Sequence, residues 1–90
     1  MNMRRASAKS TNLCGASAIE ADLQGADLRK SSLQGSNFTG ARLQFADLRG
    51  AIMTNVDLRN ADLSHADLTG ANLSGANLRG AKLHLTKMPN

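Results

Sequence analysis

The side chains that could do chemistry are spread evenly along the 90 residues instead of gathering in a motif. All six Asp are separated by multiples of five residues, and paired carboxylates can serve acid–base catalysis or bind a metal. His65 and His84 could also bind a metal, but two histidines without a third ligand make a poor zinc site. Cys14 is the only cysteine, which excludes an internal disulfide. Because the sequence shows no nucleophile–base motif and no phosphate-binding glycine loop, we expect no catalytic residue, no metal and no cofactor.

The spacing of these side chains follows a five-residue repeat that runs from Thr11 to Asn90 without a shift in phase. Twelve of the 13 Leu occupy the third position of the repeat, 12 of the 14 Ala the first, and every Asp the second. All eight Gly occupy the fifth position, and no charged residue occupies the first or the third. The repeat therefore places the chemical groups, and its structure has to be explained before their function.

A period of five residues fits neither a helix nor a flat strand. In an α-helix the leucines would advance by about 140° per repeat and spiral around the surface. In a strand an odd period would send successive leucines to opposite faces. A turn inside every repeat removes the conflict, because Gly at the fifth position suits a positive φ and Asp or Asn at the second bonds to nearby backbone. We therefore expect the chain to coil around an axis lined by Leu and Ala.

The repeat has the form A(D/N)LxX, most regularly from Ala61 to Leu78, and it resembles the pentapeptide repeat family over about residues 11–85. The resemblance implies an all-β fold, a right-handed quadrilateral parallel β-helix with four pentapeptides in each coil. The length of the chain then corresponds to about four coils. The handedness and the number of pentapeptides per coil come from the resemblance alone.

The predicted β-helix covers residues 11–88, flanked by two terminal segments. Residues 1–10 follow the repeat poorly and are expected to form either a tail or a weak first coil. Residues 89–90 end the fold, because Pro89 cannot donate a hydrogen bond to a further coil. The ends of the sequence suggest a complete small chain.

The third-position side chains are expected to form the core. One coil buries about four Leu, on the order of 10 kcal/mol, whereas ordering its 20 residues costs on the order of 20–40 kcal/mol. A single coil is therefore unstable, and coils must stack and share hydrogen bonds. The predicted core consists of Leu23, Leu28, Leu33, Phe38, Leu43, Leu48, Met53, Leu58, Leu63, Leu68, Leu73, Leu78 and Leu83.

Two surface features are candidates for contact with a partner. With four pentapeptides per coil, Phe45, His65 and Leu85 stack at a corner where glycine is usual, and an exposed apolar stripe often marks an interface. Mutual packing of these side chains is the alternative explanation. A second side of the coil, which carries Ile52, has no charged residue in any of its coils; the alternative there is drift toward small polar residues. We predict that Phe45, His65, Leu85 and Ile52 contact a partner.

We predict a non-catalytic interaction or scaffold module whose partner is another protein. A homo-oligomer formed through the ends or the uncharged side is a second way to use these surfaces. The long apolar run of a membrane span and the apolar core of a secretory signal do not occur, so we expect a cytoplasmic protein.

The resemblance suggests an alternative, because some family members imitate B-DNA and bind DNA gyrase. DNA carries one charge per about 1.7 Å, so a rod of about four coils should show about eleven acids, whereas this chain has seven, interleaved with bases. Its net charge of +4 resides in the two ends, which could bind an anion or nucleic acid. These basic residues form no continuous stripe and lack stacking aromatics, so we do not expect nucleic acid as the partner.

Overall fold

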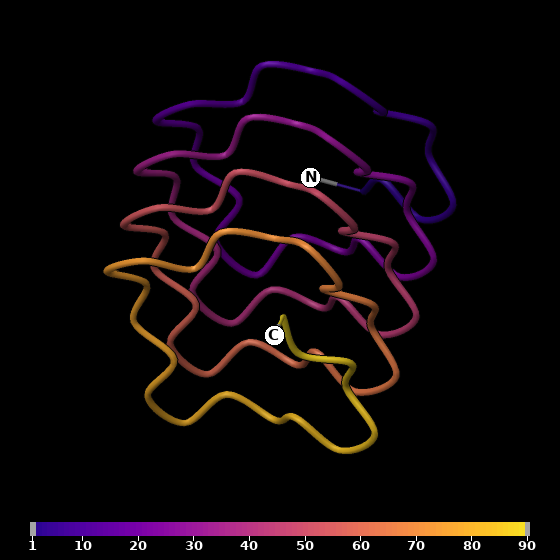
Figure 1. Ribbon diagram of the computed structural model, residues 1–90. Coiled ribbons are helices and arrows are strands. Elements are labelled where there is room, and N and C mark those ends of the chain that lie inside the picture. Colours follow the sequence, from indigo (N-terminus) through magenta and orange to yellow (C-terminus); the bar gives the residue numbers. More distant parts are fainter. Residues whose placement is uncertain (1, 90) are drawn as a thin grey trace.

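The computed structural model describes residues 2–89, which wind around one axis as a stack of coils (Figure 1). Met1 and Asn90, the outermost residues of the predicted terminal segments, lie outside the described residues. Parallel bridges join each second-position residue to the residue 20 positions later, from Asn2–Asp22 to Asp67–Lys87. Four pentapeptides therefore complete one coil, as the resemblance implied. Their bridges remain isolated because a turn follows every bridged residue from Asn2 to Lys82.

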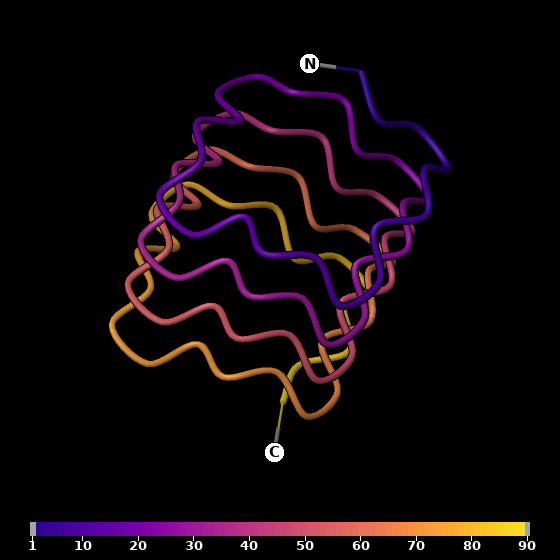
Figure 2. The same ribbon diagram turned by 90° about the horizontal axis from the view of Figure 1, so that it is seen from above.

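The stack is nearly as wide as it is tall, with extents of 25 × 23 × 20 Å. Seen from above, the coils lie over one another with their corners in register (Figure 2). Residues 2–89 contain neither a helix nor a continuous strand, and in this part of the chain nothing helical has the length and apolar character needed to cross a membrane. The corners and the flat sides between them are therefore the surfaces available for function.

A tight turn ends every pentapeptide. The fifth position has a positive φ throughout, from Arg5 at 56° to Leu85 at 56°. The carbonyl of the third position accepts a hydrogen bond from the next first position, as from the Ala46 N–H to the Leu43 oxygen at 3.0 Å. A positive φ at the third residue of a bonded turn is the geometry of type II. Each turn resets the alternation of side chains, so first and third positions always face the axis.

The remaining backbone donors explain the preference for Asp and Asn at the second position. N–H groups of the second, third and fifth positions donate to carbonyls of the adjacent coils, as Leu23 does to Arg42 at 2.7 Å. The fourth N–H has no such acceptor. In eleven pentapeptides it donates instead to the Oδ1 atom of the second position, as Gln24 does to Asp22 at 3.2 Å. The side chain of Asp or Asn thus accepts a hydrogen bond from the fourth-position N–H, which has no partner in the turn or in the bonds between coils.

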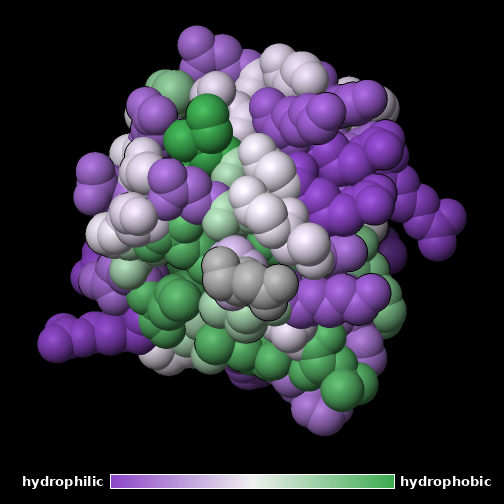
Figure 3. All heavy atoms as spheres, in the orientation of Figure 1, coloured by the Kyte–Doolittle hydropathy of each residue, from purple (hydrophilic) through white to green (hydrophobic). Residues whose placement is uncertain are grey.

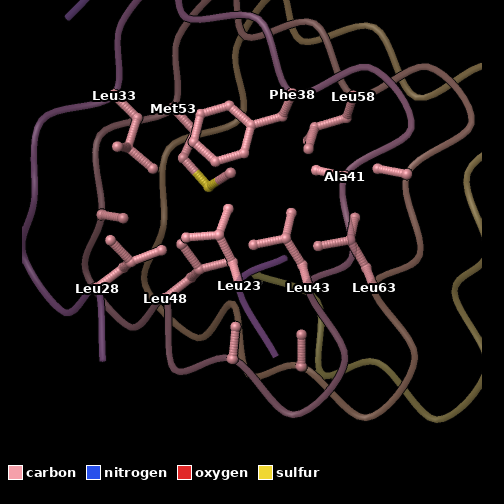
Figure 4. Close-up of a cluster of buried hydrophobic side chains, with 14 of the residues drawn as sticks. Leu23, Leu28, Leu33, Phe38, Ala41, Leu43, Leu48, Met53, Leu58 and Leu63 are labelled. Carbon is pink, nitrogen blue, oxygen red and sulfur yellow. The ribbon is translucent and has the colours of Figure 1, made fainter. Parts of the chain in front are cut away.

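Third-position side chains from all four sides meet along the axis (Figure 4). First-position alanines lie between them and are buried in the middle coils. Ten of the predicted core side chains are at most 1% exposed: Leu23, Leu28, Leu33, Phe38, Leu43, Leu48, Met53, Leu58, Leu63 and Leu68.

The final coil departs from the predicted core. Leu73 and Leu78 are only partly buried, and Leu83 is 39% exposed. The placement of Leu83 in the core is therefore wrong, because no further coil stacks on it within the described residues. Hydrophobic surface gathers along the lower edge of the molecule, where this coil lies (Figure 3).

The first coil is more regular than its sequence. Asn2 pairs with Asp22 and Ser7 pairs with Asp27, so residues 2–10 belong to the stack. Ala8 is 8% exposed and faces the axis. The ladder tolerates a poor repeat here because its hydrogen bonds use backbone groups, which do not depend on side-chain type.

The position of a leucine in the stack should decide the loss of stability when it is truncated. We expect Leu48→Ala to lower the free energy of unfolding by about 2–5 kcal/mol, because a buried cavity is left behind. Leu83→Ala should lower it by only about 1–2 kcal/mol, because this side chain is partly solvated and leaves no enclosed cavity. Urea unfolding followed by circular dichroism measures both values, and equal losses would contradict the open end of the stack.

Candidate interaction surface

Three bulky side chains replace glycine along one corner of the stack, and we name Phe45, His65 and Leu85 the aromatic corner. The rings of Phe45 and His65 stack with centroids 4.7 Å apart and planes 4° apart. His84 meets the edge of His65 at 5.8 Å and 87°. Phe45 is 65% exposed and Leu85 is 66% exposed. The structure therefore brings together three of the four predicted contact residues in an exposed stripe.

The backbone of the aromatic corner is unfavourable for these side chains. Phe45, His65 and Leu85 have φ of 62°, 63° and 56°, and the left-handed region costs an L-residue roughly 1–2 kcal/mol relative to the right-handed one. The aromatic stack returns about 0.5–1.5 kcal/mol for one pair. The free energy gained by packing within the corner therefore does not exceed the backbone cost. Folding alone does not explain why large residues occupy this corner in three successive coils.

Ile52 lies apart from the aromatic corner. It is paired between Ser32 and Asn72, two sides of the coil away from the pentapeptide that ends in Phe45, and is 37% exposed. The predicted contact residues therefore form two separate surfaces, one containing the aromatic corner and one containing Ile52.

Three carboxylates on the other sides, those of Asp27, Asp47 and Asp57, are bound by arginines of the same pentapeptide. Arg59 donates from Nε and Nη2 to Asp57 at 2.9 Å and 2.7 Å, and Arg29 binds Asp27 in the same way at 2.9 Å and 2.8 Å. These side-chain hydrogen bonds from arginine lower the pKa of Asp57 and the pKa of Asp27 to about 2. Both carboxylates are ionised at neutral pH, so neither can act as a general acid there.

The two histidines remain without a third ligand in the described residues. His65 and His84 are neighbours, but nowhere in residues 2–89 do three His, Cys, Asp or Glu side chains gather as a metal site would need. We therefore interpret His65 as part of the aromatic corner and His84 as a side chain that packs against it.

Two basic hollows near the first coil were not predicted from the sequence. One has a volume of about 280 Å³ and is lined by Arg4, Arg5, Gln24, Gly25 and Phe45. The other, of about 270 Å³, is lined by Lys9, Arg29, Lys30, Arg49 and Gly50. Residues 20 positions apart lie over one another on adjacent coils. Applying this spacing to the first ten residues would have revealed both hollows, since it places Arg5 next to Gly25 and Lys9 next to Arg29.

Acid should weaken the fold through the arginine-bound carboxylates. Because the pKa of Asp57 is lowered from 3.8 to about 2 in the folded state, its stabilisation is present above pH 4 and is lost as the pH falls toward 2. We expect Arg59→Gln to raise the pKa of Asp57 and to reduce this acid-dependent loss of stability. Carbon-detected NMR titration of the carboxyl group, with urea unfolding at each pH, measures both effects.

Arg79→Gln is the matched control for that experiment. Arg79 lies in the same column as Arg59, one coil nearer the C-terminus, but its pentapeptide has Asn77 in place of an aspartate. This variant removes the same charge without breaking a carboxylate pair. An Asp57 that titrates near 3.8 in the unmodified protein would contradict the prediction.

Comparison with known proteins supports the architecture. The sequence model of the pentapeptide repeats matches eight copies, over residues 2–35, 19–55 and 51–88. No curated relative matches the chain. Among solved structures, the pentapeptide repeat protein alr5209 from Nostoc PCC 7120 is 38% identical with a TM-score of 0.85, over 97% of this chain and 76% of that one.

Two further structures resemble the chain over most of its length. A pentapeptide repeat protein from the thylakoid lumen of Arabidopsis thaliana is 30% identical with a TM-score of 0.58, over 89% of this chain and 59% of that one. HetL from Nostoc sp. PCC 7120, described as involved in the regulation of heterocyst differentiation, is 29% identical with a TM-score of 0.53, over 99% of this chain and 49% of that one. The five-residue repeat, the four-sided coil and these matches together show that the chain belongs to the pentapeptide repeat family, whose fold is the right-handed quadrilateral β-helix.

Proposed function

We propose that this protein is a non-catalytic interaction module that binds another protein through the aromatic corner. The observation that carries the proposal is the exposure of Phe45, His65 and Leu85 on left-handed backbone, where glycine would fold at lower cost. Backbone strain that folding does not require is a feature of functional sites. The stripe also offers a partner the aromatic surface that protein interfaces favour.

Charges beside the aromatic corner supply the rim of such an interface. The second-position column on the adjoining side alternates in sign, with Asp22, Arg42, Asp62 and Lys82 on successive coils. Apolar residues at the centre and charged residues at the edge are the usual composition of a protein contact. Alternating signs in this column favour a partner with its own mixed charges over a uniformly charged polymer.

The charge pattern does not favour imitation of DNA. Asp27, Asp47 and Asp57 are each held by an arginine of the same pentapeptide at 2.7–2.8 Å. Their negative charge is therefore neutralised locally, whereas the surface of DNA is uniformly negative.

Cytoplasmic location stays a prediction, and the Arabidopsis relative comes from the thylakoid lumen.

Replacing the aromatic corner should abolish partner binding without loss of stability. We expect the triple variant Phe45→Asn, His65→Asn, Leu85→Asn to unfold within about 1 kcal/mol of the unmodified protein, because Asn tolerates a positive φ and the lost stack is small. When it is immobilised, the same variant should capture from cell extract at most a tenth of the protein that the immobilised unmodified chain captures. Urea unfolding and quantitative mass spectrometry measure the two effects.

Ile52→Thr provides the control on the opposite side of the coil. It should leave the captured protein unchanged, since Ile52 does not belong to the aromatic corner. Equal capture by the triple variant and the unmodified chain would refute the proposal. Loss of capture by Ile52→Thr alone would assign the contact to the uncharged side instead.

A further inference from the structure

The hollow lined by Arg4, Arg5, Gln24, Gly25 and Phe45 lies at the end of the aromatic corner nearer the N-terminus. One face of the Phe45 ring is directed toward it. His65 covers one side of the Phe45 ring. On the other side the next residue of the column is Gly25, which has no side chain, and beyond it lies Arg5. Because the coils stack through parallel bridges at about 4.8 Å, the backbones of Arg5 and Phe45 are two coils, or about 10 Å, apart along the column. The Arg5 side chain leans over Gly25 into this space, with its Cγ atom 3.3 Å from where a Cβ of residue 25 would lie.

The backbone spacing exceeds what one planar ring needs, and the overhanging Arg5 side chain can supply the second face. A ring in van der Waals contact on both faces needs about 7 Å between its neighbours, at about 3.5 Å per contact. The hollow of about 280 Å³ between Arg5 and Phe45 lies just below the range of about 300–1,000 Å³ that is usual for ligand pockets. The site therefore has room for a small ligand with a single ring system.

The lining of the hollow specifies an anionic ligand with polar edges. Arg4 and Arg5 both contribute to the lining, and among residues 2–89 the carboxylate paired with either of them is Asp22, 3.8 Å from the Arg4 Nε atom. This arrangement leaves a positive charge in excess. Gln24 adds an amide that can donate to and accept from the edge of a ring.

We propose that this hollow binds a free purine nucleoside monophosphate or an equivalent planar aromatic phosphate. The ring stacks on Phe45 and is covered by Arg5, as aromatic and guanidinium groups commonly hold bases. The phosphate pairs with the two arginines, which suit bidentate binding of that group. The site shares Phe45 with the proposed protein contact but does not depend on that contact, since Leu85 and His84 take no part in the hollow.

The second basic hollow provides an internal comparison. It has nearly the same volume and four cations, Lys9, Arg29, Lys30 and Arg49, but no aromatic side chain. Arg29 and Arg49 are already bonded to Asp27 and Asp47. A ligand recognised by charge alone should bind at both hollows, whereas a ligand recognised by stacking should bind only beside Phe45.

Titration of the full chain with AMP, adenosine and inorganic phosphate, followed by amide NMR, tests the proposal. We expect AMP to bind at least tenfold more tightly than either fragment, with the largest shifts at the amide groups of Arg5, Gln24, Gly25 and Phe45. Arg5→Gln should weaken AMP at least fivefold and adenosine by a smaller factor, because AMP loses the contact with its phosphate as well as the contact with its ring. Leu85→Asn should leave AMP binding intact even if it abolishes the protein contact.

Gly25→Asn fills the hollow without requiring a new backbone conformation. Its Cβ would meet only the flexible Cγ of Arg5, at 3.3 Å, and Asn accepts a positive φ. Gly35→Asn is the matched control, because Gly35 has a φ of +66° beside +68° at Gly25 and no atom within 4 Å of the added Cβ. We expect Gly25→Asn to weaken AMP at least tenfold and Gly35→Asn to retain the original affinity.

Four results would overturn the proposal. The first is phosphate binding as tightly as AMP, and the second is an AMP affinity that Gly25→Asn leaves unchanged. The third is a set of shifts centred on Lys9 and Lys30, which would show recognition by charge alone. Tighter binding of a short oligoadenylate than of AMP, with shifts beyond the hollow, would overturn the assignment to a free ligand.

Discussion

The left-handed residue at the end of every pentapeptide is the constraint on which the rest of the structure depends. A positive φ at each fifth position turns the chain and restores the inward direction of the first and third side chains. The turn leaves one backbone N–H without a partner, which accounts for Asp or Asn at the second position. The core, the ladder and the polar surface are therefore consequences of one repeated backbone geometry.

Corners are also where this protein departs from the simplest solution. Glycine adopts the required φ at no steric cost, and eight corners use it. Large corner side chains elsewhere lie over a glycine of the next coil, as Lys30 does over Gly50 and Glu20 over Gly40. Phe45 and His65 instead stack on one another. Because the backbone cost recurs at each coil, this column is the best candidate for a selected binding surface. At Gly25 only the flexible Arg5 side chain lies over the column.

Residues in the middle of the chain were predicted more accurately than those near its ends. Leu48 and Phe38 are buried as the repeat requires, since coils cover them on both sides. Leu83 has the same sequence context but lacks a covering coil in the described residues and is 39% exposed. The first ten residues show the reverse case, because backbone pairing from Asn2 and Ser7 extends the ladder despite a poor repeat. Position in the stack, which no local pattern records, decides burial.

The sequence by itself determined the period of five, the inward and outward directions of the side chains and the turn at every fifth residue. These features depend on hydrogen bonds and sterics within a single pentapeptide. The resemblance to the family supplied the four-sided coil that makes residues 20 positions apart neighbours, and the tertiary structure alone decided how Arg5, Gly25, Phe45 and His65 pack against one another. That neighbourhood depends on the angle through which each corner turns and on the number of corners that close a coil. Neither quantity is expressed within a five-residue repeat, so the aromatic corner and the hollow beside it emerge only when the coils stack.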